Sequence, residues 1–567
     1  MLILKRKKQK TKDTKGITLV ALVITIIILL ILATISIQSL TNTGLFKNAQ
    51  KAKDETQNAA ENQAKILNEY EDELNKYISG NKKTLQADGS WNSTKKVNSP
   101  QLMEGMTGIY WDESGKEVEV NVDNQDNWYD YSASKREWAN AVTKDSSGNV
   151  TGYWIWIPRY AYKIETNRYT NTVGKISVKF LQGTTNKDES NAEISTAYPE
   201  TTGATMSAYV VHPSFINGTL NHYMNGEWDK EISGYWVAKY PAGFQANTIT
   251  NNNGTLSTTI SNSSDTVVYS NKNYTSYHAN MTTNALSQNL TSSGYASQKL
   301  SYPVFKPLTY AYNNISTGDT YTISKEIASA SSFYGLNSTK TDSHQMKNSE
   351  WGAVAYLTQS SYGRNGTEIS LNNYYTTESS PWRTAITGMC TNGISGDKTT
   401  TLGNAYNTAI GVKGSSTANI TGIYDLNGCV WERTTAYISN GNASLSTYGN
   451  SYTNTTANTN GYQTLSTKWA TVYPYNSSDS NTNNYNSYSG KKSTTYGFGD
   501  AVLETSTTGS ESTSWNGDYS SFPYTYRPFL LRSGDYSHSS RAGSFAFDFV
   551  NGDPRYTHGF RSVLVAQ

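Results

Sequence analysis

Two cysteines and six histidines are the side chains of this 567-residue sequence best suited to hold a metal or to act as a nucleophile. Cys390 and Cys429 do not form a Cys-x-x-Cys pair, and two thiolates cannot complete a structural zinc site alone. The pair could form a disulfide if the body is exported, or remain two free, partly buried thiols. The histidines show no close helical spacing; they are His212, His222, His278, His344, His538 and His558.

One histidine lies near an acid in a serine-rich stretch. His538 follows Asp535 and has serines on both sides, so a Ser–His–Asp set could be drawn there. A chain this rich in serine offers such sets by chance. We therefore predict no catalytic residues and no enzyme activity.

The C-terminal tail carries residues suited to recognition. Residues 533–561 contain no Lys, Glu, Gln, Trp or Met, although all five types occur elsewhere in the chain. The mixture that remains is typical of a binding surface, where Tyr gives large contact area at low entropic cost. We predict ligand binding by ten tail residues: Asp535, Tyr536, His538, Ser540, Asp548, Asn551, Asp553, Arg555, Tyr556 and His558.

Glycines and short apolar runs must position these residues. The segments FLLR, AGSFAFDF and GFRSVLV predict strands, and four glycines between them predict turns: Gly534, Gly543, Gly552 and Gly559. The ten recognition residues would then stand on short loops at one end of a strand-rich domain.

Upstream segments predict the rest of that domain. Residues 150–164 and 232–243 are apolar and aromatic strands, and NSEWGAVAYL predicts a helix with an apolar face of Trp351, Val354, Ala355 and Leu357. We predict a linker and small strand-rich region at 81–149, then one domain at 150–567. Polar insertions are predicted near 244–300 and 440–500.

The composition indicates a folded chain with a polar surface. Only 36% of the residues are apolar, yet there are 43 Tyr and 13 Trp, and disordered chains are poor in aromatics. The net charge is +2; residues 1–15 contribute +6, which leaves −4 for the rest. The body is not basic enough to favour nucleic acid, so no nucleic-acid partner is expected.

The basic N-terminus runs directly into an apolar segment. No charged residue lies between Ile17 and Leu40, and a helix of that length would cross a bilayer. Basic flanks stay cytoplasmic. We therefore predict a transmembrane helix at 17–40 and a single-pass protein of a bacterial cell membrane with an extracellular body. A weak apolar stripe predicts a helical stalk at 41–80.

This N-terminus resembles the prepilin leader of type IV pilins and pseudopilins. The resemblance implies a leader at 1–16, cleavage between Gly16 and Ile17 by a prepilin peptidase, methylation of the new N-terminus, and other pilin-like subunits as partners. Ala21 stands where that family usually has the Glu that docks subunits, which favours a minor subunit or an anchored protein. An uncleaved anchor is the alternative.

Residues 232–567 resemble the formylglycine-generating-enzyme-like (sulfatase-modifying-factor) branch of the C-type lectin-like fold. GYWVAKYPAG is similar to the opening strand of that family, NSEWGAVAYL to its EAEWEYAAR helix, DLNGCVWERT to its DMxGNVWEWT segment, and the tail to its RGGSW…GFR segment. The predicted fold class is α+β: a transmembrane, pilin-like long helix followed by a C-type lectin-like domain with long polar insertions.

The same resemblance implies which metals to expect. Oxidising members bind copper with two cysteines just after RGGSW; RSGDYSHSSRAGS has none, so no copper site is expected. The family holds calcium in the turn before its WEW strand. The matching positions here are Asp425, the carbonyls of Gly428 and Val430, and Glu432. Two carboxylates in a glycine turn suit a hard cation, so calcium is the predicted cofactor.

Finally, the tail resembles the variable regions of proteins that are diversified by adenine-mutating retroelements. Adenine mutation of an AAC codon can give Asp, Tyr, His, Ser, Thr, Arg, Ala, Val or Phe, but never Lys, Glu, Gln, Trp or Met. We expect a non-catalytic, membrane-anchored surface protein whose hypervariable loops at 533–561 bind a protein or glycan. The alternatives are a formylglycine-generating-type enzyme with altered metal ligands and a structural minor pilin.

Overall fold

The structure is a computed structural model, and the chain forms two compact units, Met1–Thr84 and Leu85–Gln567. Gly16, Ile17 and most of the insertion predicted at 244–300 lie outside the residues that it describes. The described residues are 24–34, helical positions between 53 and 67, 84–199, 203–217, 228–243, three short strands between 248 and 268, 302–376, 384–449, 467–489, 498–510 and 512–567.

The predicted membrane anchor is wrong. Of the predicted span at 17–40, residues 24–34 are described and are helical; the others lie outside the described residues. Among the residues described, no helix is both long and apolar enough to span a membrane. This finding contradicts the transmembrane helix at 17–40, the single-pass membrane location, and the fold class that began with a long transmembrane helix.

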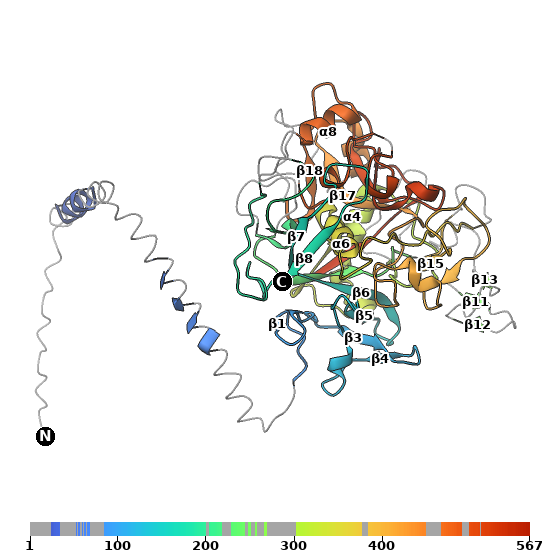
Figure 1. The fold of residues 1–567 in the computed structure, drawn as a ribbon, viewed down its shortest axis with the longest axis horizontal. Helices are drawn as coiled ribbons and strands as arrows, with labels where there is room; N and C mark the ends of the chain where they lie inside the picture. The colour runs from blue at the N-terminus through green and yellow to red at the C-terminus, as the bar shows by residue number, and fades with distance from the viewer. Residues whose placement is uncertain are drawn as a thin grey trace, which may run out of the picture. The chain divides into compact units, whose positions relative to one another are not determined.

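A seven-stranded antiparallel sheet is the largest sheet among the described residues of the second unit, and its strands β3, β4, β5 and β6 are labelled in Figure 1. Its strand order is β14-β22-β10-β6-β5-β3-β4, so strands from both ends of the unit share one sheet. Three of them come from the region predicted as separate at 81–149, which the sheet joins to the main body. The strands are β3 (Met106–Trp111), β4 (Glu117–Glu119), β5 (Asn140–Lys144), β6 (Val150–Pro158), β10 (Gly234–Ala238), β14 (Thr341–Gln345) and β22 (Ser562–Ala566).

The single strand predicted at 150–164 is two strands in two sheets. β6 ends at Pro158, and β7 (Tyr160–Ile164) pairs instead with β8 (Ile176–Phe180) and β9 (Val210–Val211). Arg159 lies between them and is buried. Its guanidinium donates to the carbonyls of Thr185 and Phe215 at 2.9 and 2.8 Å, and these bonds fix the chain where it changes sheet.

A five-stranded sheet carries the tail. β17 (Trp431–Ile438) pairs with β18 (Thr471–Tyr473), β19 (Phe529–Ser533) and β21 (His558–Phe560), and β19 pairs with β20 (Gly543–Val550). The strands predicted from FLLR, AGSFAFDF and GFRSVLV are confirmed as β19, β20, and β21 with β22. The loops between them therefore end on the same sheet.

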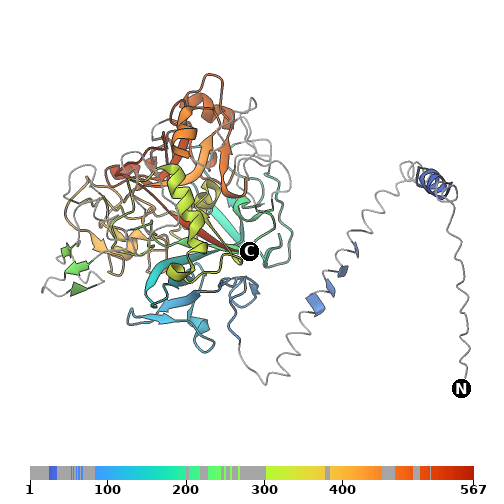
Figure 2. The ribbon, with the colours of Figure 1, turned by 180° about the vertical axis from the view of Figure 1, so that it is seen from behind.

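Helices pack beside these sheets. α6 (Asn348–Gln359), predicted around Trp351, is buried along its whole length and contacts β8 and β17. α4 (Thr317–Glu326), yellow-green in Figure 2, contacts β14 and β17. The other short elements are β1 (Trp91–Asn92), β2 (Val97–Asn98), β11 (Thr248–Thr250), β12 (Leu256–Ser257), β13 (Thr266–Val268), α5 (Ser331–Tyr334), β15 (Met389–Cys390), β16 (Asn404–Ala405), α7 (Ala443–Gly449) and α8 (Asn481–Ser489).

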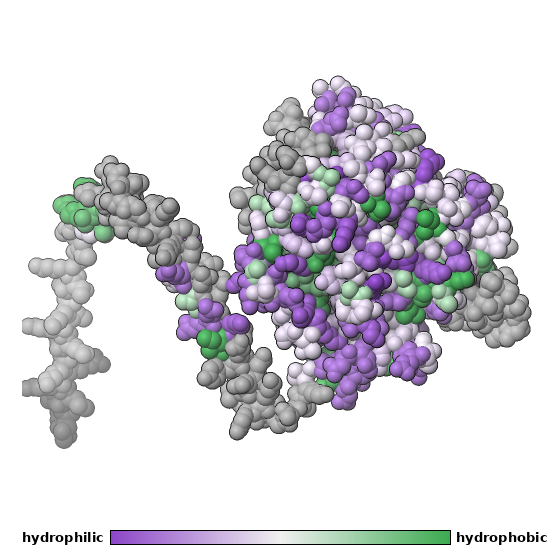
Figure 3. Space-filling model, viewed as in Figure 1, coloured by the Kyte–Doolittle hydropathy of each residue, from purple (hydrophilic) through white to green (hydrophobic). Residues whose placement is uncertain are grey.

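Aromatic side chains fill the core, and polar ones cover the surface. The carboxylate of buried Glu504 accepts hydrogen bonds from the hydroxyls of Tyr162, Tyr198 and Tyr356 at 2.9, 2.8 and 2.7 Å, so these three buried hydroxyls are paired. The region predicted as an insertion at 440–500 also supplies buried Tyr473, Tyr485 and Tyr488. The face of this unit shown in Figure 3 is mostly hydrophilic or neutral.

Candidate functional site

The ten predicted recognition residues lie on two loops and on the ends of β20 and β21. Seven of the ten are accessible: Ser540 and Arg555 are exposed, and His538, Asp548, Asn551, Asp553 and Tyr556 are half-buried. The other three are buried: Asp535, Tyr536 and His558. The tail therefore divides into residues that face solvent and residues that hold the loops.

Asp535 organises the first loop, which joins β19 to β20. Its Oδ1 accepts hydrogen bonds from the amide and hydroxyl of Ser537 at 2.7 and 2.6 Å, and lies 2.9 Å from His538 Nδ1. The loop starts at Gly534 with φ 86°, a left-handed conformation that glycine adopts without a steric penalty. When Nδ1 donates to Asp535, Nε2 of His538 is left as a hydrogen-bond acceptor.

Two aromatic residues outside the tail hold the His538 ring. Trp431 of β17 lies edge-on at 4.8 Å between ring centroids, and Tyr519 lies edge-on at 5.7 Å. Arg541 places its guanidinium 5.4 Å from the Tyr519 ring centroid. Trp431 and Tyr519 were not predicted from the sequence, because nothing in their spacing links them to the tail; only the folded chain brings them beside His538.

Asp548 contributes a carboxyl group whose charge depends on pH near neutrality. Its partner across the ladder is Leu531 of β19. Burial raises the pKa of Asp548 to about 7, and Asp535 adds to the rise, while the Phe549 amide, His538 and Arg527 oppose it. Because these groups are coupled electrostatically, Asp535, His538 and Asp548 form one cluster.

Arg433 supports the second tail loop, which joins β20 to β21. Its buried guanidinium donates to the carbonyl of Asp553 and to the hydroxyl of Thr317 in α4, and lies 3.4 Å from His558 Nδ1. Burial and this neighbouring cation hold the pKa of His558 well below its usual range, so His558 is neutral. At the surface, Arg555 forms an ion pair with Asp553 at 2.7 Å.

A ladder of aromatic rings continues the surface beside Asp548. The Arg527 guanidinium lies 5.2 Å from the Tyr526 ring centroid and 5.0 Å from that of Phe549, and Tyr524 lies edge-on to Phe549 at 4.9 Å. Tyr526 is 51% exposed. Stacked Tyr and Arg side chains of this kind are common anchors in binding interfaces.

The four residues predicted to bind calcium do not fit a calcium ion in this arrangement. Both carboxylate oxygens of Glu432 receive hydrogen bonds from Arg561, at 2.6 and 2.9 Å, so a cation would face a guanidinium. Asp425 accepts from the Asn372 amide group at 2.8 Å and from the Gly388 amide at 2.7 Å.

The backbone of the same turn is engaged as well. The carbonyl of Gly428 accepts from the Ser533 hydroxyl at 3.1 Å, and Val430 is buried. In the part of the chain that the structure describes, no group of three or more His, Cys, Asp or Glu is placed to hold a metal ion. Calcium binding by the protein stays a prediction.

The two cysteines are buried free thiols, not a disulfide. Burial raises the pKa of Cys390 to about 12 and that of Cys429 well above its usual value, so both are protonated. Cys429 has φ 64° in the turn before β17, and its carbonyl accepts from the Tyr536 amide at 3.1 Å, so it supports the first tail loop.

Comparisons with known proteins assign no family to this chain. No family model matches the sequence, and no curated protein matches it. Among solved structures, Treponema denticola variable protein 1 is similar at 10% sequence identity over 60% of this chain and 98% of that chain, with a TM-score of 0.19. A TM-score this low carries no argument about fold or function.

Proposed function

We propose that this protein is a non-catalytic binding protein that recognises its ligand through the surface of the two tail loops. The observation that carries the proposal is the division within the tail. Buried Asp535 and Arg433 fix the loop backbones from inside, while seven of the ten residues predicted for recognition remain accessible. A rigid scaffold with accessible Tyr, His, Ser, Asn and Arg is what a preformed recognition surface requires.

We further propose that the accessible positions of residues 533–561 vary between copies of the gene. The support is the residue types found there and the resemblance of the tail to retroelement-diversified regions. Variation at Ser540, Asn551 or Arg555 would change the surface without touching the core, because each side chain is exposed or half-buried. Prepilin-type processing at Gly16 and Ile17 stays a prediction, since both lie outside the described residues.

The test compares the intact protein with a variant in which Ser540, Arg555 and Tyr556 are all alanine. Both are screened against the same panel of purified bacterial surface proteins and glycans. We expect at least one ligand of the intact protein to bind the variant about tenfold or more weakly, because truncating interface anchors costs above about 1 kcal/mol each.

The matched control is Ile394→Ala, which removes another exposed side chain (46% exposed) outside the tail. Equal thermal unfolding temperatures for all three proteins show that the fold is intact. Ligands bound with the same affinity by the triple variant would contradict the proposal. Sequencing of codons 533–561 across a population tests variability: substitutions should fall on accessible positions and spare Gly534, Gly552 and Gly559.

A further inference from the structure

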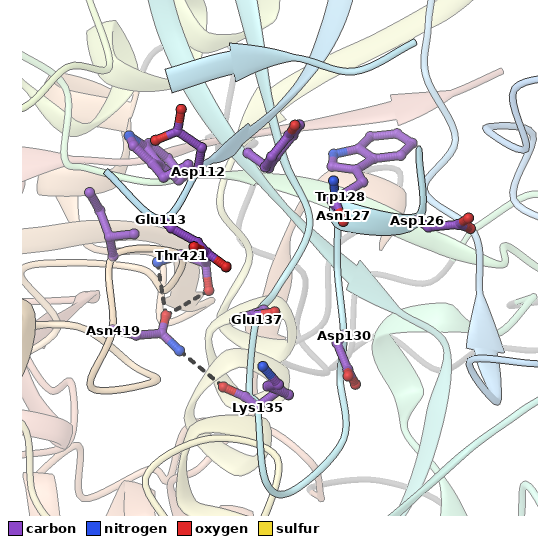
Figure 4. Close-up of a pocket in the computed structure, with 13 residues that line it drawn as sticks. Asp112, Glu113, Asp126, Asn127, Trp128, Asp130, Lys135, Glu137, Asn419 and Thr421 are labelled. Atoms are coloured by element: carbon purple, nitrogen blue, oxygen red, sulfur yellow. Dashed lines mark hydrogen bonds between the residues drawn. The ribbon is translucent and has the colours of Figure 1, made fainter. Parts of the chain in front are cut away.

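A pocket of about 480 Å³ lies away from the tail, where two distant parts of the chain meet (Figure 4). One wall is the end of β3 and the turn that follows it, from Tyr110 to Glu113. The other walls are residues 126–137 and residues 419–421. No lining residue belongs to 533–561, so this pocket does not depend on the proposed function.

Hydrogen bonds through Asn419 fix the walls of the pocket in place. The Asn419 amide nitrogen donates to the carbonyls of Lys135 and Arg136 at 3.2 and 3.0 Å, and its oxygen accepts from the Thr421 amide and hydroxyl. Figure 4 shows Asn419 between Lys135 and Thr421, with Asp112 and Glu113 on the opposite wall from Asp130. The pocket is therefore formed before any ligand binds, which lowers the cost of binding.

One wall presents an aromatic surface. Trp111 and Tyr110 line the pocket and are both half-buried. The ammonium of buried Lys239 lies 4.1 Å from the centroid of the Trp111 ring and is held by the Asn140 side chain and the Ile420 carbonyl. This contact fixes the indole as a rigid surface on which an apolar face of a ligand can stack.

The rim adds hydrogen-bond acceptors and negative charge. Five carboxylates and one lysine line the pocket, for a formal charge of −4. The side chains of Glu113, Asp126 and Glu137 accept no hydrogen bond from the described part of the protein, whereas Asp112 and Asp130 accept from neighbouring amides. Carboxylates are acceptors only, so a fitting ligand brings hydroxyl or ammonium donors.

We propose that this pocket binds an amino sugar, a saccharide that carries free ammonium groups. The carbon face of a sugar ring stacks on Trp111, its hydroxyls donate to Glu113 and Glu137, and its ammonium compensates the negative charge. A simple polyamine would use the charge but not the indole. A neutral sugar would use the indole but not the charge.

The experiment measures binding of three probes to the full-length protein by calorimetry at mildly acidic pH. The probes are a chitosan oligosaccharide, the fully N-acetylated chitin oligosaccharide of the same length, and spermidine. We expect the chitosan oligosaccharide to bind at least about tenfold more tightly than either of the others, since it alone uses both features. Its affinity should fall as salt is raised, because charge contributes.

Two variants locate the binding. Trp111→Ala removes the stacking surface, and Asp126→Asn combined with Glu137→Gln removes charge from side chains that make no internal hydrogen bond, so the second variant keeps its fold. Each variant should weaken chitosan binding about tenfold. Tyr526→Ala, in the aromatic ladder beside Asp548, should leave chitosan binding unchanged. Equal binding of chitin or spermidine, no binding of chitosan, or unchanged binding by the charge variant each overturns the proposal.

Discussion

At the scale of single residues, the guanidinium of Arg561 is a buried charge that makes four hydrogen bonds. It is fully buried, holds both oxygens of Glu432, and also donates to the carbonyls of Ala238 and Tyr424 at 2.7 and 2.8 Å. These bonds join β10, β17 and the turn before β17. Removing the guanidinium leaves the Glu432 carboxylate buried without its partner, which costs far more than losing an exposed pair.

We therefore expect Arg561→Met to lower the free energy of unfolding by about 3–5 kcal/mol. Arg555→Met, which breaks the more exposed pair with Asp553, should cost at most about 1 kcal/mol. Urea unfolding of both variants measures the difference. Adding Glu432→Gln to Arg561→Met should restore part of the stability, because the unpaired carboxylate charge is then gone. Equal losses of unfolding free energy for Arg561→Met and Arg555→Met would show that the buried pair contributes little.

The same residue scale shows what a sequence can and cannot reveal about the site. Of the four glycines predicted at turns, Gly534 and Gly552 are confirmed by their positive φ, whereas Gly543 and Gly559 lie in β20 and β21. Tyr536 was predicted to bind ligand, yet it is buried and stacks on Tyr375 at 5.4 Å. In a chain with 43 tyrosines, neighbouring sequence does not separate a core tyrosine from a surface one, because the partner ring is far away along the chain.

At the scale of elements, His344 connects β14 to α6. Its Nδ1 lies 2.7 Å from Asp342, and its Nε2 lies 3.0 Å from Glu350 in the first turn of α6. Burial lowers the pKa of His344, but the two carboxylates more than offset this, and the net shift is upward. A raised pKa means that the stabilisation is fully present below the unfolded value of about 6.5 and is lost as pH rises through the folded value.

We expect His344→Gln to lower the unfolding temperature most at mildly acidic pH, where the lost ion pairs are worth on the order of 3 kcal/mol. The gap between the variant and the intact protein should narrow as pH rises. Thermal unfolding followed by circular dichroism between mildly acidic and mildly alkaline pH measures this. A gap that stays constant with pH would mean that His344 acts only through packing.

The positions of helices and strands were easier to predict than the pairing of the strands. The helix around Trp351 and the strands of the tail follow from local pattern, and α6, β19 and β20 confirm them. The break at Arg159 has one local signal, the preceding Pro158, because proline cannot donate to a strand ladder; the residues on both sides are otherwise equally apolar and aromatic. Its cause is a set of carbonyl partners 26 and 56 residues downstream, and such contacts exist only once the two sheets have formed.

At the scale of the whole molecule, the last strand is paired on both sides, second from one edge of the seven-stranded sheet. β22 lies between β14 and β10, with Leu564 opposite both Ser343 and Trp236. Val563 and Leu564 are fully buried, and Val565 is 3% exposed. A strand that pairs on both sides cannot be removed without exposing two strand edges and part of the core. The unit Leu85–Gln567 is thus closed by β22, which joins β14 to β10.

This placement predicts opposite outcomes for truncations at the two ends. A chain that stops at residue 561 should show no cooperative thermal unfolding, because it loses β22 and the apolar burial that β22 provides. A chain that starts at residue 85 should unfold within a few degrees of the intact protein, because every described strand of its sheets lies after residue 90. Calorimetry of the two truncated chains and the intact protein tests this prediction. A cooperative transition in the chain without residues 562–567 would mean that the five-stranded sheet folds independently of the seven-stranded sheet. The tail loops could then be presented without the seven-stranded sheet.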